Sequence, residues 1–176
     1  AVVFAAGPGQ ARRSIPVGRE YLFYSAALLC LTGLLGVTIT GDVFNVFVFM
    51  EISSLSSYIL IALGRERRAL MAAFTYLIMG TIGATFLLIG IGLMYQMTGT
   101  LNMVDMAVRL QAVSDTRTIL VAVAFVIVGI STKLAVFPLH QWLPNAYSEA
   151  PPIVSAFLAA TATKVAYYLL LRFTLG

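Results

Sequence analysis

The sequence predicts an all-α membrane protein with about five transmembrane helices. Hydrophobic residues make up 60% of its 176 residues and charged residues only 10%, and the mean hydropathy is +0.96. This composition lies outside the range of soluble globular domains. The apolar residues also occur in blocks of about 20, the length with which a helix rising ~1.5 Å per residue crosses a hydrocarbon core ~30 Å thick.

Five apolar blocks define the expected spans. They cover approximately residues 21–40, 43–64, 69–97, 118–137 and 153–175, and residues 21–176 are expected to form one membrane domain. Residues 1–20 are interpreted as the end of a preceding helix and a cytoplasmic link. Because the chain has no initiator Met and stops directly after an apolar run, we expect it to be a fragment of a longer protein.

The segments between the spans differ in character. Asp42, in a very short turn, is suited to cap the helix that follows it. Residues 98–117 fit either a polar loop or a short helix lying at the membrane interface. Residues 138–152 are expected to form a proline-rich, rigid connector, with Trp142 and Tyr147 at the level of the lipid head groups.

The basic residues indicate topology. Two clusters, Arg12, Arg13 and Arg19 before the first span and Arg65, Arg67 and Arg68 after the second, fall on one side, which the positive-inside rule makes the cytoplasm. A multi-pass protein of a bacterial-type cytoplasmic (inner) membrane is therefore expected. The net charge of +4 reflects this arrangement, so no nucleic-acid partner is expected.

Three ionisable residues lie inside the spans: Glu51, Lys133 and Lys164. Each costs ~2.5 to 3.5 kcal/mol at a helix centre on insertion scales, so such residues face a bundle interior or water and mark ion paths. On a helical period, Glu51 shares a face with Ser54 and Tyr58.

Hydroxyl groups also accompany the two lysines. Thr132 precedes Lys133, and Thr161 and Tyr168 share the face of Lys164. The small residues before Lys133 and Pro138 after it favour a distorted helix, whose freed backbone groups can bind water.

Two interpretations of these charges stay open. Glu51 and one lysine could form a static ion pair that braces a non-conducting membrane scaffold. Alternatively, a lysine whose carboxylate partner moves or becomes protonated is a proton-loading site, and the three groups could relay a proton.

The remaining chemistry-bearing residues are few. His140 is a poor metal site alone; it is either a residue of the interfacial connector or a proton-transfer step near neutral pH. The single cysteine, Cys30, excludes an internal disulfide and a cysteine-based metal cluster. No nucleotide-binding or nucleophile motif is found, so we expect no cofactor or metal and no catalytic site here.

Three stretches carry a family resemblance: TGDVFNVFVFMEISSLSSYILIALG, STKLAVFPLHQWLPNAYSEAPP and AATATKVAYYLLLRF. The chain resembles the proton-translocating antiporter-like subunits of respiratory complex I, membrane-bound hydrogenases and Mrp-type cation/proton antiporters. The resemblance implies an inverted-repeat bundle, with the present spans as helices four to eight of about fourteen. It makes residues 21–176 part of a proton-conducting transporter domain. It makes Glu51 the helix-five glutamate, Lys133 the lysine of the broken helix seven and Lys164 the helix-eight lysine, and it matches His140 to the connector histidine.

One departure bears on the choice within that family. Where complex I subunits commonly read WLPDAH, this chain has Asn145 and Tyr147 in WLPNAY, which favours members like the MrpD-type antiporter proteins. The resemblance therefore implies part of the proton path of an Mrp-type Na⁺/H⁺ antiporter complex, with other membrane subunits, protons, Na⁺ and the lipid bilayer as partners. The alternative is an antiporter-like subunit of a proton-pumping NADH:quinone oxidoreductase or a membrane-bound hydrogenase. In either case Glu51 and Lys133 would form a switchable pair.

Overall fold

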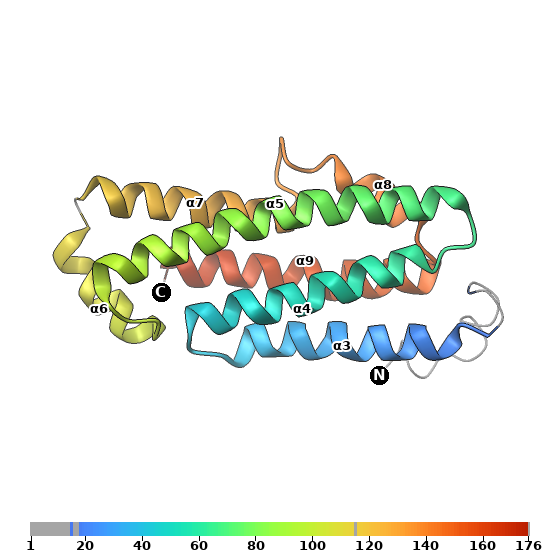
Figure 1. Cartoon of the computed structure of the whole chain (residues 1–176), viewed down its shortest axis with the longest axis horizontal. Coiled ribbons are helices and arrows are strands. Elements are labelled where there is room, and N and C mark those ends of the chain that lie inside the picture. The colour runs from blue at the N-terminus through green and yellow to red at the C-terminus, as the bar shows by residue number, and fades with distance from the viewer. Residues whose placement is uncertain (1–14, 16–17, 115, 176) are drawn as a thin grey trace.

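The computed structural model describes residues 15, 18–114 and 116–175. Within these residues, five long helices lie side by side, as Figure 1 shows. They are α3 (Glu20–Ile39), α4 (Val43–Ala62), α5 (Arg67–Thr98), α7 (Arg117–Leu134) and α9 (Pro152–Leu175). All five are long and apolar enough to cross a membrane. The predicted all-α membrane fold is therefore confirmed.

Two short helices lie in the segments between the spans: α6 (Met103–Val113) and α8 (Trp142–Glu149). Of the two alternatives for residues 98–117, the structure therefore shows the short helix. The expected connector is also partly helical. The preceding helix expected in residues 1–20, with Arg12 and Arg13, falls mostly outside the described residues.

The fourth expected span is shorter than predicted. Its helix, α7, ends at Leu134 rather than at residue 137, because Ala135 adopts a left-handed conformation with φ 57°. The helix thus stops directly after Lys133, and the chain runs through a turn into α8. The break expected after this lysine is present.

Helix α6 is amphipathic and lies across one end of the bundle (Figure 1). Its Val104 and Val108 are 76% and 65% exposed, whereas Met106 is buried. A helix with this pattern fits the boundary between lipid tails and head groups.

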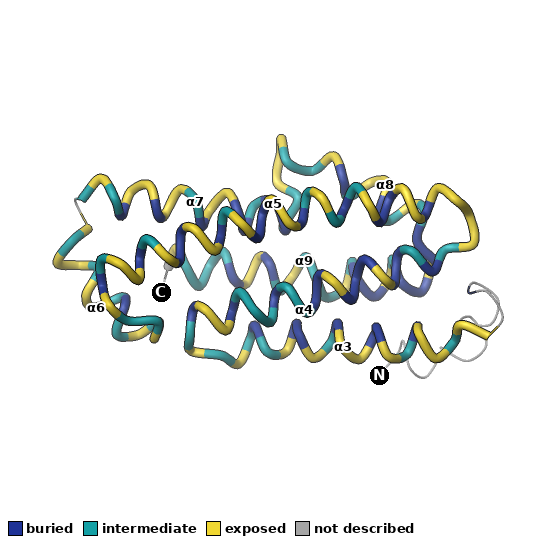
Figure 2. Tube along the Cα trace, viewed as in Figure 1, coloured by how far each residue is buried: buried dark blue, intermediate teal, exposed yellow. Residues whose placement is uncertain are grey.

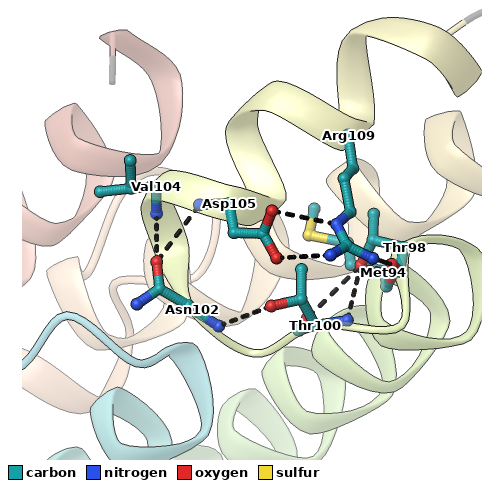
Figure 3. A network of polar contacts seen from close by, with 7 residues as sticks. All are labelled: Met94, Thr98, Thr100, Asn102, Val104, Asp105 and Arg109. Carbon is teal, nitrogen blue, oxygen red and sulfur yellow. Dashed lines mark hydrogen bonds and ion pairs between the residues drawn. The ribbon is translucent and has the colours of Figure 1, made fainter.

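A polar network fixes the start of α6 (Figure 3). Asn102 caps the helix by accepting hydrogen bonds from the backbone N–H groups of Val104 and Asp105 at 3.0 and 3.2 Å. Arg109 pairs with Asp105 at 3.0 Å and donates to the carbonyl of Thr98 at 3.0 Å. The hydrogen bond from Arg109 lowers the pKa of the Asp105 carboxyl. The network ties α6 to the end of α5.

The turn between α3 and α4 joins this region. Val43 N–H donates to the carbonyl of Leu101 at 2.9 Å, and Met103 N–H donates to that of Gly41 at 2.8 Å. Asp42 caps α4 as expected, accepting from Asn45 N–H at 2.9 Å. Two turns far apart in the sequence therefore hold the same end of the bundle.

Burial follows the packing of the helices. On α3, the buried positions lie on the side that faces α4 (Figure 2), whereas leucines such as Leu28 and Leu29 are more than half exposed on the outside. Helices α5 and α7 approach closely at Gly83 and Gly129, where a Cβ on Gly129 would lie 2.7 Å from the Gly83 carbonyl oxygen. Small residues allow such contacts between membrane helices.

Candidate proton-transfer site

The centre of the site is an ion pair between two spans. Lys133 Nζ, from the last turn of α7, lies 3.6 Å from Glu51 Oε1 of α4. The lysine side chain is 6% exposed and that of the glutamate 25%. The two residues expected to pair are thus in contact, within an apolar bundle where an unpaired charge would be costly.

Hydroxyl groups of α4 complete the surroundings of the ammonium. Lys133 Nζ donates to Ser54 Oγ at 2.5 Å and to the Tyr58 hydroxyl at 3.4 Å. The Ser54 hydroxyl donates in turn to the Met50 carbonyl at 2.8 Å. Glu51, Ser54 and Tyr58 share one face of α4, as the helical period predicts, and all three reach the same ammonium.

The glutamate is held less tightly than the lysine. At 3.6 Å, its contact with Lys133 is an ion pair and exceeds hydrogen-bond distance. Glu51 Oε1 is buried and accepts no hydrogen bond from the described residues. The ammonium is therefore held by two hydroxyl groups in addition to its ion pair with the carboxylate.

Two glycines of α5 make room for this arrangement. A Cβ on Gly80 would overlap the Tyr58 hydroxyl and lie 3.2 Å from Lys133 Nζ. A Cβ on Gly83 would lie 2.9 Å from the Cβ of Thr132. The place of Gly80 beside the ammonium was not predicted from the sequence.

A small cavity adjoins the lysine. Its volume is about 30 Å³, enough for roughly two water molecules. The polar part of its wall comes from Lys133, Tyr76 and the serines Ser53, Ser54 and Ser57, and the apolar part from α3, α4 and α9. It offers water a place beside the hydroxyl cluster, and all five long helices contribute to its wall.

The structure does not bring Lys164 into this cluster. Its side chain lies on the exposed face of α9 and donates to the carbonyl of Ala159 in the same helix. Thr161 donates to Phe157 O at 2.7 Å, and Tyr168 is 41% exposed. The α9 residues that line the cavity, among them Ala162 and Val165, are apolar. A role for Lys164 in the path therefore stays a prediction.

His140 lies in the turn between α7 and α8. Its ring is 5.6 Å from that of Phe137, and its Nδ1 is buried without a hydrogen-bond partner among the described residues. Nowhere in the described part of the chain do three His, Cys, Asp or Glu side chains gather as a metal site would require. Both interpretations of His140 stay open.

Trp142 occupies a different place from the one predicted. It is 3% exposed, stacks on Tyr76 at 4.2 Å and donates its indole N–H to the Thr132 carbonyl at 3.0 Å. It lies in the core rather than at the head groups, because α8 packs back against α5. Tyr147 on the same short helix is partly buried, which raises its pKa to about 12.

The comparisons with known proteins agree with this geometry. Residues 40–176, which include the pair and its hydroxyl partners, match the family model described as NADH:quinone oxidoreductase/Mrp antiporter, TM. The chain belongs to this family. The resemblance stated from the sequence motifs is thus confirmed.

The relatives of this chain include subunits named as oxidoreductases and subunits named as antiporters. NADH-quinone oxidoreductase subunit N of Desulforudis audaxviator (strain MP104C) is 52% identical over 150 residues, which are 85% of this chain and 30% of that protein. The putative antiporter subunit mnhD2 of Staphylococcus aureus (strain Newman) is 39% identical over 154 residues, 88% of this chain and 31% of that protein. The chain therefore spans about a third of the length of these relatives.

A Na(+)/H(+) antiporter protein of Bacillus subtilis (strain 168) is similar over a longer stretch. It is 37% identical over 165 residues, 93% of this chain and 34% of that protein. The preference for MrpD-type proteins drawn from Asn145 and Tyr147 is not strengthened by these comparisons, since a relative named as an oxidoreductase subunit has the higher identity.

A solved structure gives the same fold. A chain of the Mrp complex from Dietzia sp. DQ12-45-1b superposes with a TM-score of 0.75 at 36% identity, over 83% of this chain and 28% of that one. The five spans of this chain are therefore arranged as in a membrane subunit of a multi-subunit complex.

Proposed function

We propose that this chain carries part of a proton-translocation path, with Glu51 and Lys133 as its switchable pair. The observation that carries the proposal is the buried contact between the two side chains at 3.6 Å, together with the hydroxyls of Ser54 and Tyr58 and the adjoining cavity. A scaffold needs no such set of exchangeable groups, whereas a proton path does.

The proposed transfer depends on the charge of Glu51. While the carboxylate is ionised, its attraction for the ammonium at 3.6 Å is roughly 5 kcal/mol at an effective dielectric constant of ~20. When Glu51 is protonated or turns away, that attraction is lost, and a buried ammonium without a counter-charge releases its proton more readily. The proton then passes to water in the cavity beside Ser57.

Lys164 is proposed as a later acceptor, with the hydroxyls of Thr161 and Tyr168 beside it. Because its side chain lies outside the cavity, the proton must reach it around or between the apolar residues of α9. His140, whose Nδ1 lacks a partner among the described residues, is a candidate for transfer at the break of α7.

The driving reaction of the whole protein is also a proposal. We prefer an Mrp-type exchange of Na⁺ or another monovalent cation for H⁺, on the strength of Asn145 and Tyr147. The second candidate is a proton-pumping NADH:quinone oxidoreductase or a membrane-bound hydrogenase, which the 52% identity to an oxidoreductase subunit favours. Both place the chain among other membrane subunits, with lipid around the exposed apolar faces.

The proposed location is a bacterial cytoplasmic membrane. Arg19 lies at the same end of the bundle as Arg65 and Arg67, and the three line one surface pocket. These three arginines lie on one side of the bundle, which supports the proposed location, because cytoplasmic loops carry the excess of Lys and Arg.

Replacement of the lysine tests the proposal. In the full-length protein reconstituted with its partners, Lys133→Ala should abolish proton flux while the complex still assembles, because the proton-loading group is lost. The matched control is Thr81→Ala, which removes an exposed hydroxyl bonded only within α5 and should leave flux unchanged. Flux near the wild-type level in Lys133→Ala would contradict the proposal.

The same vesicles separate the two driving reactions. A Na⁺ gradient without any electron donor drives proton movement in an Mrp-type exchanger. Proton movement that requires an electron donor and acceptor instead identifies the redox-driven alternative.

A further inference from the structure

The end of α7 next to Lys133 is closed by a side chain from another helix. Because α7 stops at Leu134, the carbonyls of its last turn have no partner further along the helix. Trp142 of α8 donates its indole N–H to the carbonyl of Thr132 at 3.0 Å. Thr132 directly precedes Lys133, so the indole holds the peptide from which the lysine side chain extends.

The local turn supplies the other hydrogen bonds. Ala135 N–H donates to the same Thr132 carbonyl at 3.3 Å, and Val136 N–H donates to the Ser131 carbonyl at 3.1 Å. These are the two bonds of a Schellman motif, the usual way to end a helix. The position after Leu134 has Ala135 at φ 57° instead of the usual glycine, so the turn is strained and benefits from the additional bond to the indole.

An aromatic stack connects the indole to the ammonium. The Trp142 ring stacks on Tyr76 at 4.2 Å and 6°, and Tyr76 meets Tyr58 edge-to-face at 4.7 Å and 89°. The Tyr58 hydroxyl then accepts a hydrogen bond from Lys133 Nζ at 3.4 Å. Lys133 is thus held at both ends, by its backbone and by its ammonium, through one continuous group of side chains.

We propose that Trp142 is a positioning residue for Lys133, which holds the last turn of α7 so that the ammonium reaches Ser54. The indole itself exchanges no proton in this role. The inference rests on the proposed function, because proton flux is the quantity that reports the position of the lysine.

The first experiment removes only the indole N–H. In the full-length protein, amber suppression at position 142 introduces 3-benzothienylalanine, which keeps the shape and the stacking of the ring but has sulfur in place of N–H. We expect proton flux in the reconstituted complex to fall roughly three- to tenfold, the effect of one lost hydrogen bond to a buried carbonyl. The matched control, 5-fluorotryptophan introduced in the same way, retains the N–H and should keep flux near the wild-type level.

A second experiment separates positioning from general stabilisation. The analogue is combined with Ser54→Ala, which removes the acceptor toward which the lysine is aimed. If Trp142 acts through that contact, the analogue should cost little further flux in the Ser54→Ala protein, since coupled residues are not additive. Phe157→Leu, a loss of volume elsewhere in the same buried cluster, should instead add its full effect to that of Ser54→Ala.

Either of two results would overturn the inference. One is wild-type flux with the benzothienyl analogue, and the other is a full, additive loss when it is combined with Ser54→Ala. The absence of flux in the unmodified complex would instead count against the proposed function, so the two failures are distinguishable.

Discussion

At the scale of single residues, Ser54 is the nearest partner of the proposed proton carrier. Its hydroxyl accepts from Lys133 Nζ at 2.5 Å, closer than either Glu51 or Tyr58. A hydrogen bond from a charged donor contributes about 1.5 to 3 kcal/mol. We therefore expect the hydrogen bond to Ser54 to fix the position of the ammonium when Glu51 no longer attracts it.

Removal of this hydroxyl should weaken proton transfer. We expect Ser54→Ala to lower proton flux about tenfold without abolishing it, because Tyr58 and Glu51 still bind the ammonium. Ser56→Ala is the matched control: Ser56 is also buried on α4, but its hydroxyl donates to the Ile52 carbonyl and makes no described contact with Lys133. Equal flux losses in the two variants, measured in reconstituted vesicles, would argue against a specific role for Ser54.

Much of the pair's surroundings could be predicted from the sequence. The cost of charge in a bilayer indicated Glu51 and Lys133, and the helical period placed Ser54 and Tyr58 beside the glutamate. Trp142 was misplaced at the head groups, because the packing of α8 against α5 is a tertiary contact without a periodic signal. Gly80 was missed as a neighbour of the ammonium for the same reason.

At the scale of elements, Lys133 lies in the C-terminal turn of α7. Carbonyl groups at a helix C-terminus carry partial negative charge, which favours a cation in the last turn by about 0.3 to 1 kcal/mol. Lys133 occupies that turn. The left-handed conformation of Ala135, which ends the helix, costs roughly 1 kcal/mol relative to glycine. The turn that holds the lysine is therefore next to a strained residue.

This strain predicts a stabilising substitution. Ala135→Gly should raise the free energy of unfolding by about 0.5 to 1 kcal/mol, because glycine adopts positive φ without steric cost. The matched control is Ala124→Gly, at an exposed position within α7, which should lower stability by a similar amount. Thermal unfolding of the full-length protein in detergent measures both, and a loss of stability in Ala135→Gly would contradict the assigned backbone conformation.

Element boundaries were predictable where polar residues mark them and less so elsewhere. Asp42 identified the start of α4 through its capping role, and the structure shows that bond. The end of α7 was placed three residues too late, since Ala135, Val136 and Phe137 are apolar and continue the pattern of the span. Helix α6 could be predicted only as one of two alternatives, because a short amphipathic pattern of this kind is also compatible with a polar loop.

At the scale of the whole molecule, the ion pair of Glu51 and Lys133 lies inside the bundle, and many apolar side chains of the spans face outward. Exposed leucines, isoleucines and valines cover the outer faces of the spans, whereas Lys133 is enclosed by α4, α5 and α7. This arrangement fits a lipid-exposed protein with an internal polar path. Lys164 differs from the pair, because it lies on the outer face of α9. This chain spans about a third of the length of its relatives, and the proposed role of Lys164 in a longer path depends on helices in the other two thirds.

The central claim is that Lys133 gives up its proton, and Lys133→Arg tests it most directly. Arginine keeps the positive charge and can preserve the ion pair with Glu51, but its guanidinium is not deprotonated in proteins. Proton flux per assembled full-length complex should therefore be lost in Lys133→Arg while assembly persists. Flux near the wild-type level would show that a static charge suffices, and would contradict the account.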